Sequence, residues 1–203
     1  MKPYVYLAGQ ITKNWWRNAL TNTEYTPKTR IPFVDVMNYH KDDYFYSTYE
    51  CEDFIVTGPH AVGCDHGCFH DFPHAASGYC LGSGDTFVTT KEVCDACCDQ
   101  IKRAEVLFAY IEEEEAFGTF AEIGVAKGLG KYIHILFKTK KLAKKLWFLS
   151  EMADAFSIQD GEDTPEIRKA FQKCMVDFEH KKISDTIKAN TKAAAEKAKM
   201  TKK

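Results

Sequence analysis

Glu122 lies in the part of the chain whose residue types and spacing are best suited to chemistry. It follows a hydrophobic run, Val106–Ile111, and four consecutive glutamates, and the spacing around it predicts a short helix before a second hydrophobic run, Tyr132–Phe137. In a parallel sheet, ligands bind beyond the carboxyl ends of the strands, where a helix N-terminus presents free backbone N–H groups. We expect Glu122 in the first turn of this helix. There it either performs chemistry or closes a capping box with Thr119, in which each side chain binds a backbone N–H.

The elements that must position Glu122 are predicted from hydrophobic patterns. Five short apolar runs rich in β-branched and aromatic residues are predicted strands: Tyr4–Ala8, Phe33–Met37, Phe54–Thr57, Val106–Ile111 and Tyr132–Phe137. Helical spacing between several of them indicates a parallel sheet covered by helices. A further helix is expected from Leu142 to Phe156, and another from an N-cap at Thr164 through Phe178.

Two motifs in this order resemble the nucleoside 2-deoxyribosyltransferase family. The strand Tyr4-Val-Tyr-Leu-Ala-Gly-Gln10 is similar to the family's opening Y-L-A-G-P, and the turn Thr57-Gly-Pro59 is similar to one in its phage and bacterial branch. The family's second motif, G-T-x-x-E-[IL]-G-x-A-x-x-x-G-K, is filled here by Gly118, Thr119, Glu122, Ile123, Gly124, Ala126, Gly130 and Lys131. The resemblance spans roughly residues 4–137, and its specificity rests mostly on residues 118–131.

The resemblance implies an N-glycosidic-bond enzyme. Glu122 would be the nucleophile that attacks the anomeric carbon of a nucleoside or nucleotide, forming a glycosyl-enzyme ester that a second base or water resolves. Tyr6 would orient its carboxylate, and the helix N-terminus would keep it ionised; the alternative for Tyr6 is a place in the core. Pattern and resemblance together predict an α/β protein with a flavodoxin-like, doubly wound sheet of five parallel strands, flanked by helices and interrupted by a long Cys/His-rich loop.

Substrate contacts are expected from residues at the ends of strands and in the adjoining loops. They are Gly9, Gln10, Gly58, Pro59, Asp65, His66, Asp95, Gly118 and Thr119. Gln10 stands where the family commonly has proline, and Ala116 where it has an acidic residue. These departures leave other functions open: a pure nucleotide N-glycosidase, an NAD-cleaving hydrolase, or a non-catalytic nucleotide-binding or interaction module. No cofactor is expected.

A second cluster of chemically active residues lies in the long loop after Gly58. Six of the eight cysteines and four of the seven histidines fall within residues 60–98. Cysteine and histidine are the usual ligands of zinc, but Cys64 and Cys68 lack the paired C-x-x-C spacing of a zinc knuckle. We therefore expect no metal, and interpret these residues as buried thiols and as histidines that bind loop backbone or line a substrate pocket.

Charge and composition limit the partners. The formal net charge is −2, but residues 181–203 hold eight lysines against Asp185 and Glu196, a local charge of +6 that leaves −8 for residues 1–180. We expect a catalytic domain at 1–180 and a basic, flexible tail or solvated helix at 181–203. Without a net positive charge or a long apolar run, neither a specific nucleic acid nor a membrane is an expected partner. The missing secretory signal favours a cytoplasmic protein, in which a reducing environment would keep the eight cysteines as thiols.

A homo-oligomer is expected from the region after the last strand. The segment Leu146–Met152 carries Trp147 and Phe148 beside two leucines that face the core, so its apolar side chains point in more directions than one buried stripe can hold. The resemblance implies that a neighbouring subunit completes each active site from this region. The alternative is a helix buried on two sides within one chain.

Overall fold

Six strands form a single sheet in the computed structural model, which describes residues 1–10, 15–21, 48–59, 90–159 and 164–200. Along the chain the strands are β1 (Tyr4–Ala8), β2 (Tyr49–Glu50), β3 (Ile55–Gly58), β4 (Val106–Ile111), β5 (Tyr132–Phe137) and β6 (Ala155–Ile158). The helices are α1 (Trp15–Thr21), α4 (Thr90–Arg103), α5 (Phe117–Gly128), α6 (Lys140–Lys145), α7 (Trp147–Met152) and α8 (Thr164–Met200).

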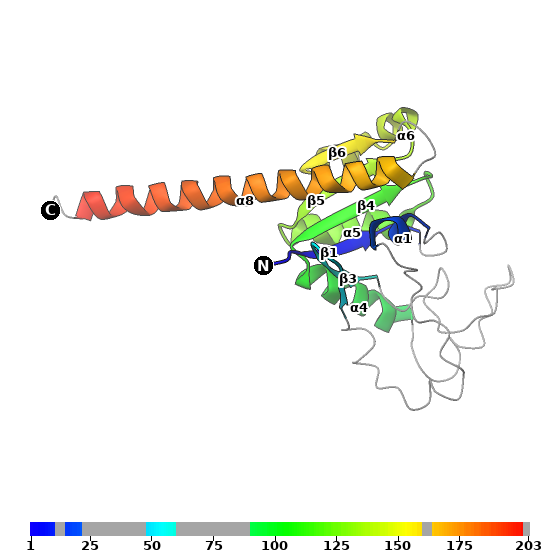
Figure 1. The fold of residues 1–203 in the computed structure, drawn as a ribbon, viewed down its shortest axis with the longest axis horizontal. Coiled ribbons are helices and arrows are strands. Elements are labelled where there is room, and N and C mark those ends of the chain that lie inside the picture. Colours follow the sequence, from blue (N-terminus) through cyan, green and yellow to red (C-terminus); the bar gives the residue numbers. More distant parts are fainter. Residues whose placement is uncertain (11–14, 22–47, 60–89, 160–163, 201–203) are drawn as a thin grey trace, which may run out of the picture.

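The strand order is β2-β3-β1-β4-β5-β6 (Figure 1). Five strands, β3, β1, β4, β5 and β6, are parallel, and the two-residue β2 adds an antiparallel edge. The predicted α/β fold with five parallel strands is confirmed, and the strand order is that of a flavodoxin-like fold. The chain reverses its direction of winding between β1 and β4, and the crevice beyond the carboxyl ends of such strands is where this class of sheet binds ligands.

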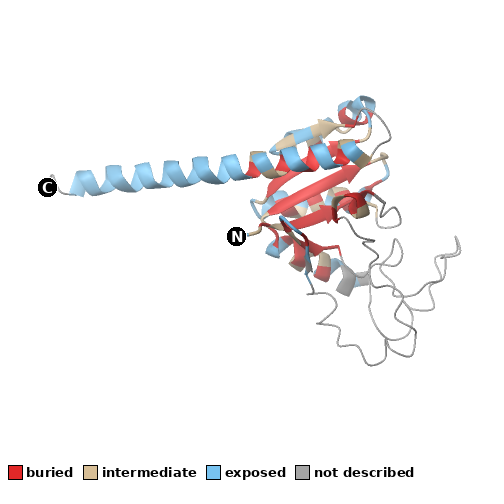
Figure 2. Cartoon of the chain, viewed as in Figure 1, coloured by how far each residue is buried: buried red, intermediate tan, exposed pale blue. Residues whose placement is uncertain are grey.

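Helices cover both faces of the sheet, which explains why its strands lack polar alternation. Every residue of β4 and β5 is buried, as Figure 2 shows in red. On one face α1 and α8 contribute Trp16 and Phe171, which pack against Phe108 of β4. On the other face α4 and α5 contribute Ile101 and Ile123.

The expected helix from Leu142 to Phe156 is wrong. Two short helices, α6 and α7, are joined at Leu146, and the chain then becomes extended at Ala153 and forms β6. The strand begins where Asp154 both accepts a hydrogen bond from the Ile133 backbone N–H at 2.9 Å and donates its own N–H to the Ile133 carbonyl. Pairing with β6 gives hydrogen-bond partners to the backbone N–H and C=O groups along the edge of β5. This stabilisation outweighs the helical preference that the spacing of the apolar residues indicates.

β6 is therefore the fifth parallel strand. The predicted strand Phe33–Met37 lies outside the described residues, so it stays a prediction.

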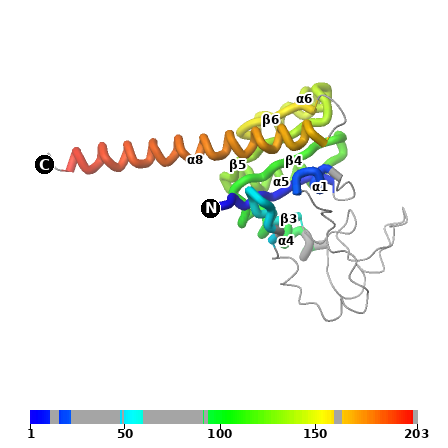
Figure 3. The backbone as a smooth tube through the Cα atoms, viewed as in Figure 1, coloured from blue at the N-terminus to red at the C-terminus, as the bar shows by residue number. Residues whose placement is uncertain are grey.

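Helix α8 is longer than expected. Its buried residues, Ile167, Phe171, Cys174 and Phe178 among them, match the predicted apolar face. The helix then continues without a break to Met200, and every residue from Glu179 onward is exposed. Figure 3 shows this part of α8 extending beyond the sheet. Among the described helices, α8 included, none is long and apolar enough to cross a membrane.

Candidate active site

A tyrosine on β1 and a glutamate on α5 form the centre of the candidate site. Tyr6 is fully buried on the sheet face that α4 and α5 cover. Its hydroxyl donates a hydrogen bond of 2.5 Å to Oε1 of Glu122. The two residues are far apart in sequence, so the contact depends on the packing of α5 against the central strand. The structure thus joins the two residues that the sequence predicted to be catalytic.

Glu122 does not lie in the first turn of its helix. Helix α5 begins at Phe117, the N-cap position is Ala116, and no side chain caps the first turn. Thr119 is therefore inside the helix, so the capping box, which was the alternative role for Glu122, is not formed. Glu122 lies in the second turn, where its carboxylate accepts the Tyr6 hydrogen bond instead of a backbone N–H. The carboxylate is thus not engaged in starting the helix.

Burial dominates the electrostatics of Glu122. It raises the pKa of the carboxyl from its usual 4.5 to about 7, although the Tyr6 hydrogen bond and the charge of Arg17 both act to lower it. The expectation that the helix N-terminus keeps Glu122 fully ionised is wrong, because the helix field weakens beyond the first turn while burial penalises the charge directly. Near neutral pH the carboxyl exchanges its proton readily, a property of catalytic acids and bases.

The buried hydroxyl and thiol beside Glu122 are held neutral. Burial, together with the nearby carboxylate, raises the pKa of Tyr6 well above its usual value. The Cys97 thiol on α4 lies beside the Tyr6 hydroxyl, and burial raises its pKa to about 12. Both groups can donate hydrogen bonds to an ionised Glu122 or to a ligand, but neither is a nucleophile at neutral pH.

Arg17 is a site residue that sequence reasoning missed. It is fully buried on α1, and its guanidinium donates hydrogen bonds to the carbonyls of Leu7, Gly9 and Gln10 at 2.8–3.1 Å. These bonds fix the chain where β1 ends, and the charge lowers the pKa of Glu122. The available signal was an arginine directly after two tryptophans, because an arginine that packs among buried aromatic residues requires dedicated acceptors.

Gly9 and Gln10 form the turn after β1. Gly9 adopts a φ of +155°, and a Cβ there would lie 2.8 Å from the Trp16 ring, so only glycine fits this position. The Gln10 carbonyl is held by Arg17, and its side chain is partly buried. Both residues lie at the carboxyl end of the central strand, as the sequence predicted.

Gly58 and Pro59 form the corresponding turn after β3, joined by a cis peptide bond. A Cβ on Gly58 would lie 2.0 Å from Oε1 of Gln100 and 3.0 Å from Cε2 of Tyr6. Gly58 therefore allows the Tyr6 ring to pack between β3 and α4. Gly58 thus supports the site through Tyr6, and the substrate contact expected of Gly58 and Pro59 stays a prediction.

The remaining predicted contacts differ in their placement. Gly118 is exposed and Thr119 buried in the first turn of α5. Asp95 points to the surface of α4, where it forms an ion pair of 2.5 Å with Lys91, while Cys97 on the same helix is the residue beside Tyr6. Asp65 and His66 lie outside the described residues.

The acidic loop between β4 and α5 is held by lysines. Glu112 forms an ion pair of 3.2 Å with Lys138, which follows β5, and Glu114 forms one with Lys145 on α6. The loop thus lies next to the start of α5, and two of its carboxylates are held by lysines of the neighbouring elements. In the described part of the chain, no group of three His, Cys, Asp or Glu side chains is arranged to hold a metal ion.

Comparison with known proteins identifies no family for this chain, so a function rests on the geometry of the candidate site. No model of a known protein family matches the chain, and no curated protein matches it either. The Tyr6–Glu122 pair, placed beside the switch point of a flavodoxin-like sheet, is accordingly the feature on which a function must be argued.

Proposed function

We propose that the protein is an N-glycosidic-bond enzyme that cleaves or exchanges the base of a nucleoside or nucleotide through a glycosyl ester on Glu122. The observation that carries this proposal is the hydrogen bond of 2.5 Å between the Tyr6 hydroxyl and Glu122 Oε1. It supports a carboxylate with a fixed orientation and with no competing role in capping its helix. The resemblance to nucleoside 2-deoxyribosyltransferases is the reason for choosing this reaction class.

The proposed reaction has two displacement steps. With Oε1 held by Tyr6, the other carboxylate oxygen of Glu122 attacks the anomeric carbon. The bond to the base nitrogen breaks, and the base leaves with the electron pair and takes a proton. A second base or water then attacks the same carbon, the ester bond breaks, and the carboxylate is regenerated while the attacking group loses a proton. Both transition states carry positive charge on the sugar, which a nearby carboxylate stabilises.

The raised pKa of Glu122 sets the pH dependence of this proposal. Attack requires the ionised carboxylate, and burial places the pKa at about 7 in the absence of substrate. Below that pH most molecules hold a protonated, unreactive Glu122, so kcat/KM rises with pH and levels off above about 7. A role for Glu122 as a general acid predicts the opposite slope.

A shared active site is part of the same proposal. On α7 the Trp147 and Phe148 side chains are 63% and 62% exposed, and their rings contact each other. Exposed aromatic residues of this kind favour a protein interface. The proposed oligomer places this patch of one subunit beside the crevice of another.

Incubation with a panel of nucleosides, deoxynucleosides, nucleotides and NAD, with chromatographic detection of free base, tests the proposal. The expected result is base release by the wild type and none by Glu122→Ala. Glu115→Ala, which removes an exposed glutamate just before α5, serves as the matched control and keeps activity. An added acceptor base separates transfer from hydrolysis. Full turnover by a folded Glu122→Ala protein contradicts the proposal, and binding without base release favours a non-catalytic module.

A further inference from the structure

Helix α8 leaves the body of the protein after two ion pairs. Lys181 contacts Asp154 at 2.5 Å, and Lys182 contacts Glu105 at 3.2 Å. Beyond these contacts the helix continues to Met200 with every residue exposed. Most helix stability in proteins comes from packing of an apolar face, and the exposed extension lacks such packing within the described chain. The extension, residues 181–200, therefore gains stability if another surface covers it.

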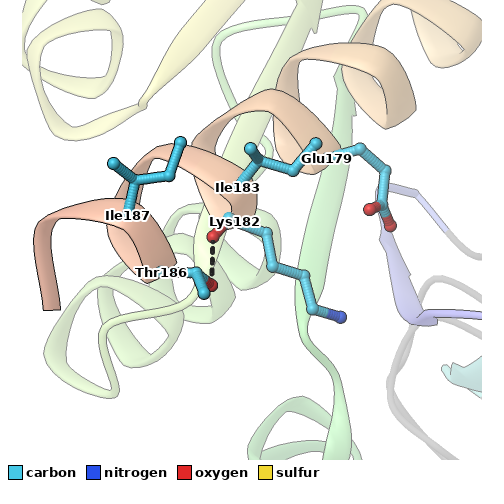
Figure 4. A pocket seen from close by; sticks show the side chains of 5 residues that line it. All are labelled: Glu179, Lys182, Ile183, Thr186 and Ile187. Carbon is cyan, nitrogen blue, oxygen red and sulfur yellow. Dashed lines mark hydrogen bonds between the residues drawn. The ribbon is translucent and has the colours of Figure 1, made fainter. Parts of the chain in front are cut away.

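The extension carries an apolar stripe that starts over the body. Val176, Ile183 and Ile187 are 54%, 56% and 60% exposed. They are separated by seven and four residues, which places them on one side of the helix. Figure 4 shows Ile183 and Ile187 beside Lys182 and Thr186 around a shallow pocket. β-Branched aliphatic residues repeated at this spacing are typical of a helix that packs against another helix.

A groove lies beside the start of this stripe. It has a volume of about 870 Å³ and is on the sheet face opposite α5, so it is separate from the proposed catalytic site. Its apolar wall includes Leu20, Phe54, Phe171, Met175 and Val176. Glu179 lines both this groove and the pocket of Figure 4, so the two form one continuous surface along α8.

The charges of the groove and the extension are complementary. Glu52, Asp53 and Glu179 contribute carboxylates to the groove, with Arg168 as its basic side chain. The last part of the chain, residues 181–203, carries a net charge of +6, whereas residues 1–180 carry −8. An apolar groove with acidic walls thus matches an apolar stripe flanked by lysines, and both belong to the same chain.

We propose that two copies of this chain pair through α8 in antiparallel orientation, so that the extension of each copy lies in the groove of the other. Antiparallel packing follows from the placement of the two surfaces. The groove lies along the first half of α8 and the extension forms its second half, so a parallel pair leaves both grooves empty. Pairing about a two-fold axis near Glu179 places Ile183 of each copy against Val176 of the other, with helix axes about 8–10 Å apart.

Light scattering on the full chain tests the pairing. The variant Ile183→Asp/Ile187→Asp is expected to halve the mass of the wild-type assembly, because it buries two charges in the seam. The control Ala189→Asp/Ala195→Asp adds the same charges on other sides of the same exposed helix segment and is expected to keep the wild-type mass. Circular dichroism confirms folding of both variants, whose substituted residues are all exposed. If the isoleucine variant keeps the mass of the wild-type assembly, the proposal is overturned. That result would mean that another surface, such as the one around Trp147, holds the subunits together.

Cysteine cross-linking tests the orientation. In the Val176→Cys/Ile183→Cys variant, oxidation is expected to give a dimer in which peptide mapping finds position 176 linked to position 183. Seven residues span about 10 Å along a helix, so this link cannot form within one chain. Links between identical positions indicate a parallel pair and overturn the proposal. A wild-type mass equal to the 23.1 kDa of one chain also overturns the proposal. In that case binding of the extension to anionic vesicles or RNA would not rescue it.

Discussion

Replacing Glu122 with glutamine is expected to raise the free energy of unfolding at pH 8, even though it removes the proposed nucleophile. Burial raises the pKa of the folded carboxyl from 4.5 to about 7. A carboxyl whose pKa is higher in the folded state stabilises the protein below its unfolded pKa, and this contribution is lost as pH rises through the folded value. Between pH 4.5 and 7, the wild type therefore loses stability through Glu122, while a neutral glutamine does not.

The size of the effect follows from the two pKa values. The difference between 4.5 and about 7, at about 1.4 kcal/mol for each unit, sets an upper limit of about 3.5 kcal/mol. Since the side chain is partly rather than fully buried, we expect a gain of about 1–3 kcal/mol for Glu122→Gln at pH 8, and a much smaller one at pH 5. Glutamine keeps an oxygen that accepts the Tyr6 hydrogen bond, so the packing changes little.

Urea denaturation at pH 5 and pH 8 measures this difference, with Glu115→Gln as the control. An exposed glutamate changed to glutamine is expected to shift stability by no more than about 0.5 kcal/mol at either pH. If Glu122→Gln changes the free energy of unfolding equally at both pH values, or lowers it at pH 8, the reasoning about the buried carboxyl is refuted.

Three further predictions concern the residues around the site and the core. Tyr6→Phe is expected to lower kcat/KM about 100-fold and to move the rise of its pH profile to higher pH, because the hydrogen bond that lowers the carboxyl pKa is lost; an unchanged profile in steady-state assays would refute the contact. Burial lowers the pKa of His134 to about 4. As pH falls from 6.5 to 4, the free energy of unfolding of the wild type is therefore expected to fall by about 1–3 kcal/mol relative to that of His134→Phe, as measured by urea denaturation. Equal pH dependence of the two proteins would contradict this. Gly58→Ala is expected to destabilise the fold by about 1–3 kcal/mol, because the added Cβ meets Gln100. Gly124→Ala, which adds a Cβ in open space on α5, is expected to stabilise the fold by about 0.5–1 kcal/mol in the same assay. Similar effects of both changes would count against the close packing at Gly58.

The strands near the site could be predicted because they are buried on both faces. Their continuous runs of β-branched and aromatic residues are hard to confuse with surface structure, and β1, β4 and β5 have the predicted bounds. Strand β6 could not be predicted in this way. Its Phe156 falls at helical spacing from Leu149 and Ala153, and only pairing with β5 decides between the two conformations.

Two residues of the candidate site were predicted, but its geometry was not. Tyr6 and Glu122 were singled out by the motifs that resemble nucleoside 2-deoxyribosyltransferases. The sequence spacing of Thr119 and Glu122 matches a capping box, but the N-cap of helix α5 lies three residues earlier, at Ala116, because a local pattern does not fix where a helix begins. The role of Arg17 depends on carbonyls at the end of β1, which become a set of acceptors only after the chain has folded.

Trapping the glycosyl-enzyme ester tests the central claim most directly. A substrate with fluorine at C2 of the sugar slows both steps by destabilising the positively charged transition state, and a reactive leaving base lets the first step proceed. Acid quenching followed by mass spectrometry of proteolytic fragments is expected to find one sugar bound to Glu122, and none in Glu122→Gln. An adduct on another residue, or base release by Glu122→Gln at the wild-type rate, would contradict the assignment of Glu122 as the nucleophile.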